Sequence, residues 1–158
     1  TRCSRDWSSD VCSSDLDPVA IARLFLHVRE AGPNTGQRVE AIQKWCGGKS
    51  GESWCCYFVT MVLDLCYAGQ SPIPRQGACQ GVYDLAKQKG WVTATPSVGD
   101  IYLYVTAADD HAHHIGIVTG VNPLVGISGN TSEDGTSSNG DRVAEHAIAA
   151  KVFVAYPR

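Results

Sequence analysis

Hydrophobic residues recur at helical spacing through the first half of the chain. The Asp17-Pro18 pair suits the N-cap and first position of a helix, so a helix is predicted to begin there. Two more short helices are predicted over residues 39–46 and 80–89. Between them, residues 54 to about 68 have apolar side chains over a wide face and, with Ser53 as N-cap, predict a buried central helix.

After Trp91 the pattern changes to the alternation typical of β-strands. Asn122-Pro123 predicts a tight turn between two of these strands. The predicted strands cover residues 101–105, 114–121, 124–128, 143–148 and 152–156. Helices followed by strands predict an α+β fold, with N-terminal helices packed on a C-terminal antiparallel β-sheet.

The composition is that of an ordinary globular protein, with 44% hydrophobic and 18% charged residues among 158. Residues 17–158 suit a single domain with one core. The net charge is −3 and no basic stripe is present, which argues against a nucleic-acid partner. No apolar run is long enough to span a bilayer, and no signal peptide is visible. We therefore expect a monomer that is made in the cytoplasm.

The first sixteen residues differ in composition and in hydrophobic pattern from the rest of the chain. Residues 1–16 are rich in Ser and Asp, repeat the pattern SSD and show no hydrophobic periodicity. They resemble the conceptual translation of a sequencing-library adapter, so we interpret them as a non-native leader. The alternative is a natural disordered tail. In both cases Cys3 and Cys12 take no part in the expected chemistry.

Residues 51–59, with the sequence GESWCCYFV, suggest a nucleophile. They place Cys55 in the first turn of the predicted central helix. The positive end of a helix and a nearby histidine can lower a cysteine pKa to roughly 3.5–7.5, which makes the thiolate available. First-turn N–H groups can also stabilise the oxyanion of a tetrahedral intermediate. Cys56, about 100° further round the helix, is the alternative nucleophile. The cysteines expected to be core residues are Cys46, Cys66 and Cys79.

A base is offered by residues 109–118, with the sequence DDHAHHIGIV. Strand alternation places His114 and Gly116 on one face and His113 on the other, so only one of these histidines can face the nucleophile. We predict His114 as the base, with small Gly116 leaving room for substrate. Asn130 follows the next strand and would return to His114 in a hairpin. Its side-chain carbonyl could then accept the far imidazole N–H.

No cofactor and no metal site is predicted. The seven cysteines include no CxxC pair, which argues against a zinc ribbon. We interpret the cluster over residues 109–113 as a polar loop, because adjacent side chains seldom bind one ion well. Glu133-Asp134-Gly135 is interpreted as a solvated turn rather than a calcium loop. His146 is expected to lie at the surface or to be partly buried.

Four motifs occur in the order typical of the CHAP domain, the cysteine, histidine-dependent amidohydrolase/peptidase family. They are Trp-Cys-x-x-Phe-Val at 54–59, Gly-Asp at 99–100, His-Ile-Gly-Ile-Val at 114–118 and Gly-Asn-Thr at 129–131. The chain therefore resembles this branch of the papain-like, NlpC-type cell-wall hydrolases, which includes phage endolysins. By this resemblance Cys55 matches the nucleophile, His114 the base and Asn130 the orienting residue.

The resemblance implies a thioacyl-enzyme mechanism without a cofactor. It implies bacterial peptidoglycan as the partner, cut at the muramoyl–L-alanine amide or at a peptide bond of the stem or cross-bridge. Cys56 stands where the family usually has a small residue, and Ser128 stands where many members carry an acidic one. The residues expected to bind substrate are Ser53, Trp54, His113, Gly116 and Ser128.

Three other functions remain compatible with the sequence. An antibacterial effector would use the same chemistry in competing cells, and a neighbouring immunity gene would distinguish it. A non-catalytic wall-binding domain would keep the fold without an activated Cys55. A metal-binding protein would use the histidines over residues 111–114.

Overall fold

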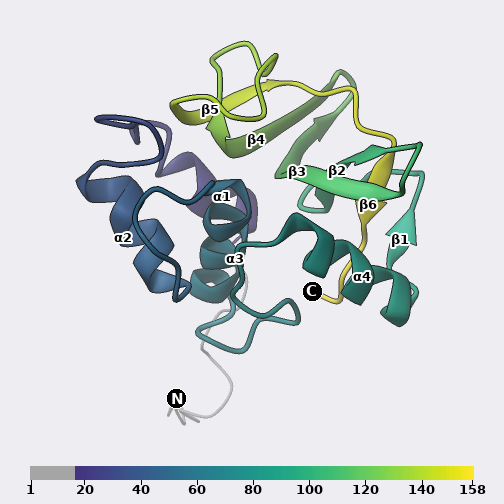
Figure 1. Cartoon of the computed structure of the whole chain (residues 1–158). Helices are drawn as coiled ribbons and strands as arrows, with labels where there is room; N and C mark the ends of the chain where they lie inside the picture. Colours follow the sequence, from purple (N-terminus) through teal and green to yellow (C-terminus); the bar gives the residue numbers. More distant parts are fainter. Residues whose placement is uncertain (1–16) are drawn as a thin grey trace, which may run out of the picture.

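The computed structural model describes residues 17–158, which contain four helices and a six-stranded antiparallel sheet (Figure 1). The predicted α+β arrangement, with helices first and strands second, is therefore confirmed at this level. Residues 1–16, interpreted above as a leader, lie outside the described residues. Within residues 17–158 no helix is both long enough and apolar enough to cross a membrane.

The helices match the predicted positions closely. They are α1 (Pro18–Arg23), α2 (Gln37–Trp45), α3 (Cys55–Cys66) and α4 (Cys79–Lys89). Asp17 caps α1 as predicted, because its side chain accepts a hydrogen bond from the Val19 N–H at 3.0 Å. The predicted cap of α3 was wrong: the N-cap is Trp54, not Ser53, and its side chain makes no capping hydrogen bond. The Trp54 indole instead turns into the core and donates to Glu30 Oε1 at 2.8 Å.

The cap of α1 gives a direct stability prediction. Asp17→Ala is expected to lower the free energy of unfolding by about 0.5–2 kcal/mol, because the Val19 N–H loses its acceptor. Asp17→Asn keeps an acceptor oxygen and is expected to cost much less. Urea denaturation of both variants checks this. Equal losses for alanine and asparagine would show that the hydrogen bond does not stabilise the helix start.

The sheet has the strand order β1-β6-β2-β3-β4-β5. Its strands are β1 (Val92–Thr93), β2 (Ile101–Thr106), β3 (His111–Val121), β4 (Leu124–Thr131), β5 (Arg142–Ala147) and β6 (Val152–Val154). All five predicted strands are present, and β3 and β4 form the hairpin that the Asn122-Pro123 turn predicts. The two-residue strand β1 was not predicted, because it is too short to show alternation.

Each face of the sheet contributes to a separate hydrophobic cluster. The face that packs with the helices has buried residues Ile101, Leu103, Ile115, Ile117 and Ile127. A smaller cluster contains Tyr102, Val118, Ile148, Ala150 and Phe153. Helix α3 contacts α1 and α2 as well as β3 and β4, so it is the central helix that the sequence predicts (Figure 1). This helix therefore lies where the other helices meet the sheet.

Candidate active site

The site is centred on Cys55, the first residue of α3. Its sulfur lies 3.7 Å from the sulfur of Cys79, which is the first residue of α4. The starts of two helices therefore meet at a pair of thiols, and the two cysteines form no disulfide. Cys55 is only 5% exposed. The sequence assigned Cys79 to the core, and nothing in its local pattern indicates that it contacts Cys55.

Contact with Cys79 raises the pKa of the Cys55 thiol well above its ordinary value, and burial raises it further. The nearby His114 lowers this pKa, but it does not outweigh the other two causes. The expected lowering of the pKa at the helix start was therefore wrong for this structure. The physical reason is that Cys79 and neighbouring side chains cover the thiol, which leaves a thiolate poorly solvated. The influence of His114 nevertheless shows that its imidazole lies close to the Cys55 thiol.

His114 is held by β3 and is buried. It pairs with Tyr104 of β2, and the two rings stack with centroids 6.0 Å apart. Its Nε2 lies 3.2 Å from the hydroxyl oxygen of Ser128. Its Nδ1 is buried and has no hydrogen-bond partner. Ser128 thus fixes the orientation of the ring through Nε2, and Nδ1 is left free to accept a proton.

Asn130 does not orient His114 as predicted. Its Nδ2 donates to Asn139 Oδ1 at 3.4 Å, and its Oδ1 is buried without a hydrogen-bond partner. The reason is a register shift between Ser128 and Thr131, where Asn130 adopts a left-handed backbone with φ 54°. Such an irregularity breaks strand alternation and redirects the side chain. Ser128, expected to bind substrate, is the residue that contacts the imidazole.

A second histidine stands behind Ser128. Nε2 of His146 lies 3.3 Å from the Ser128 hydroxyl, and its Nδ1 lies 3.0 Å from the Ala147 carbonyl oxygen. His146 is 7% exposed, so the expected position at the surface or partly buried was wrong. Strand register brings it there: β5 pairs with β4 so that His146 lies opposite Gly126, two residue pairs along the strand from Ser128. This pairing joins segments far apart in the chain, and no local pattern predicts it.

The other predicted substrate-binding residues lie in different surroundings. Trp54 is 0% exposed and cannot touch a substrate in this conformation. A Cβ on Gly116 would lie 2.3 Å from the Tyr102 ring, so this ring fills the space that we expected substrate to use. His113 is exposed and lies with Nδ1 3.4 Å from Thr106 Oγ1, outside the buried cluster. Ser53 is exposed beside the nucleophile, where contact with substrate remains a prediction.

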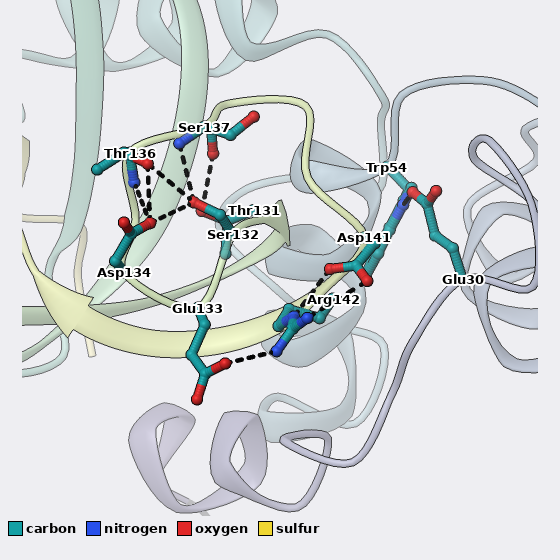
Figure 2. A network of polar contacts seen from close by, with 10 residues as sticks. All are labelled: Glu30, Trp54, Thr131, Ser132, Glu133, Asp134, Thr136, Ser137, Asp141 and Arg142. Carbon is teal, nitrogen blue, oxygen red and sulfur yellow. Dashed lines mark hydrogen bonds and ion pairs between the residues drawn. The ribbon is translucent and has the colours of Figure 1, made fainter.

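The acidic segments proposed as remote metal candidates are engaged in hydrogen bonds. Figure 2 shows that Asp134 Oδ1 accepts from the Ser132 hydroxyl at 2.7 Å and from the Thr136 hydroxyl at 2.8 Å. These contacts lower the pKa of Asp134 to about 2. Asp110 accepts from Tyr83 and Lys87. Among residues 17–158 no group of three or more His, Cys, Asp or Glu side chains is arranged to hold a metal ion.

A cavity of about 410 Å³ has in its wall two residues that accept hydrogen bonds from Trp54 and Asn130. Asn139 in its wall accepts the hydrogen bond from Asn130, and Glu30 accepts the hydrogen bond from Trp54. Its lining residues are Glu30, Pro33, Asn34, Asn139, Gly140 and Asp141. Neither Cys55 nor His114 lines this cavity.

Comparisons of the chain with protein-family models, with curated protein sequences and with solved structures find no match.

Cys79→Ala is expected to increase the reactivity of Cys55. Removing the contact that raises the Cys55 pKa should lower this pKa, so the thiolate forms at lower pH. The rate of iodoacetamide labelling of the Cys55 peptide, measured by mass spectrometry across a pH series, should rise at lower pH than in the wild type. The control is Cys46→Ala, which removes a thiol hydrogen-bonded to the Tyr57 carbonyl instead. An unchanged labelling profile in Cys79→Ala would contradict the prediction.

Proposed function

We propose that this chain is a cysteine hydrolase that cleaves amide bonds, with Cys55 as the nucleophile and His114 as its base. One observation carries the proposal. His114 is buried with Nε2 engaged by Ser128 and Nδ1 without a partner, and it lies close enough to the thiol of Cys55 to lower its pKa. A thiol nucleophile and a nearby imidazole base are the two side chains that acyl transfer through a covalent intermediate needs.

The raised pKa of Cys55 determines how the first step must proceed. A pKa raised above its ordinary value means that Cys55 enters the reaction as a thiol, which must give up its proton during the attack. As the sulfur attacks the amide carbonyl carbon, Nδ1 of His114 accepts the thiol proton. The same proton then passes to the leaving amine, and the C–N bond breaks to give a thioacyl-enzyme. Water attacks this thioester, with His114 as base, and restores the thiol.

The start of α3 supplies the groups that stabilise the oxyanion. The first backbone N–H groups of a helix have no acceptor within the helix, and the Trp54 side chain makes no capping bond to them. These dipoles favour negative charge on the carbonyl oxygen of a substrate attacked by Cys55. Cys79 contacts the sulfur at 3.7 Å, so we expect its side chain to move when a substrate reaches the thiol.

Bacterial peptidoglycan is the substrate that we propose. The support is the order of the four sequence motifs, which resembles the CHAP domain, together with a helix-borne cysteine and a strand-borne histidine as in papain-like, NlpC-type hydrolases. The bond cut would be the muramoyl–L-alanine amide or a stem or cross-bridge peptide bond. We propose that the protein is made in the cytoplasm and acts on the wall after release by a holin or another non-classical route.

A non-catalytic wall-binding domain of the same fold is the second candidate. The buried Cys55 and its raised pKa favour it, because both reduce the reactivity of the thiol. Incubation with defined, purified peptidoglycan discriminates the two functions. The hydrolase is expected to release fragments whose masses identify the bond cut. Binding to the wall without release of any fragment would favour the non-catalytic domain.

A further inference from the structure

We propose that His146 is a positioning residue that acts through Ser128 to hold His114 with its proton on Nε2 and a bare Nδ1. The inference rests on the proposed function, because it concerns the base that Cys55 needs. It follows from three contacts in series: His114 Nε2 to Ser128 Oγ at 3.2 Å, Ser128 Oγ to His146 Nε2 at 3.3 Å, and His146 Nδ1 to the Ala147 oxygen at 3.0 Å.

The Ala147 carbonyl oxygen, the last group of the three contacts, sets the direction of every hydrogen bond among them. The Ala147 carbonyl oxygen can only accept, so Nδ1 of His146 carries the hydrogen. In neutral His146 the other nitrogen, Nε2, is then an acceptor, and the Ser128 hydroxyl donates its one hydrogen to it. The Ser128 oxygen is left to accept from His114 Nε2–H. His114 is therefore the tautomer with an unprotonated Nδ1, the form that can take a proton from Cys55.

Packing keeps the series in place. Ser128 is fully buried, and His146 is almost so. Gly135 lies against the His146 ring, where a Cβ would come within 2.1 Å of Nδ1. The ring therefore cannot turn toward this side without a clash. His114 is itself pinned by its stacking on Tyr104. The arrangement can orient a catalytic imidazole although no carboxylate contacts it.

Loss of the His146 acceptor is expected to reverse the series. Without it, the Ser128 hydroxyl can turn and donate to His114 Nε2, which moves the imidazole proton to Nδ1. That proton then occupies the nitrogen that must accept from the Cys55 thiol. A histidine held in the wrong tautomer leaves the geometry intact but loses most of its effect as a base.

The test compares His146→Phe, which has no acceptor, with His146→Gln, whose amide oxygen can stand where Nε2 stands. Nitrogen-15 NMR of labelled protein reports the tautomer of His114 directly, and iodoacetamide labelling at neutral pH reports the Cys55 reactivity. Wild type and His146→Gln are expected to show the Nε2–H tautomer. His146→Phe should show a large Nδ1–H population and a labelling rate lower by at least roughly tenfold. Ser128→Ala, which interrupts the same series, should lower the labelling rate as well.

Wild-type His114 in the Nδ1–H tautomer, or an unchanged tautomer in His146→Phe, would overturn the proposal. Loss of the thermal transition would show that His146→Phe does not fold. In that case Ser128→Ala is compared with His146→Gln instead, by the His114 tautomer and by the Cys55 labelling rate. A labelling rate in Ser128→Ala equal to that of the wild type would then overturn it. The readouts need no substrate, so a correct tautomer in a chain that cleaves no peptidoglycan would refute the hydrolase and leave the positioning role standing.

Discussion

Cys55→Ala is expected to abolish the release of fragments from purified peptidoglycan, with the rate falling by on the order of 10⁴-fold. Alanine cannot form the thioacyl bond. His114 acts on the pKa of Cys55 and is not among the groups that shift the pKa of Cys46, Cys66 or Cys79. Mass spectrometry of the soluble fragments over time measures the effect. The side chain is small, so the folded state should persist, and a thermal melt verifies this.

Cys56→Ala is the matched control, because it removes the neighbouring thiol from the same helix turn. Cys56 is fully buried, and its side chain is expected to pack without reaching substrate. The variant should retain fragment release within a few-fold of the wild type. If Cys56→Ala were inactive and Cys55→Ala active, the nucleophile would be Cys56. If both variants kept full activity, the proposed hydrolase would have no thiol mechanism.

Trp54→Ala is expected to lower the free energy of unfolding by about 3–5 kcal/mol. The indole is 0% exposed, and its ring packs so closely on Gly129 that a Cβ there would come within 2.6 Å of it. Its Nε1 also donates to Glu30 Oε1 at 2.8 Å (Figure 2). Removing it leaves a cavity directly before the nucleophile and a carboxylate that has lost its donor. Urea denaturation measures the loss.

Trp54→Phe separates packing from hydrogen bonding. Phenylalanine fills much of the same volume but cannot donate to Glu30, so the expected loss is about 1.5–3 kcal/mol, the range for hydrogen bonds to charged groups. The Michaelis constant for peptidoglycan should not change in this variant, because a fully buried indole does not touch substrate. A several-fold rise in that constant, with stability intact, would restore the substrate-binding role that the sequence suggested.

The fold was largely predictable because its signals are local. Each signal depends on residues that are close together in the sequence: the Asp17 cap, the alternation in β2 to β5 and the wide apolar face of α3. The predicted start of α3 was wrong by one residue because a tertiary contact competed with a local capping preference. Ser53 is a good capping residue, yet Trp54 takes the N-cap position because its indole is drawn into the core toward Glu30.

The sequence by itself determined the candidate nucleophile and base, because each belongs to a short motif at the end of one element. Only the tertiary structure decided what surrounds them. Strand register and a left-handed residue took Asn130 away from His114 and put Ser128 in its place. The packing of α4 on the sheet brought Cys79 against Cys55 and raised the pKa of the nucleophile. The physical reason is the same in each case. Contacts between segments far apart in the chain depend on how whole elements pack and pair, and no spacing within one segment encodes them.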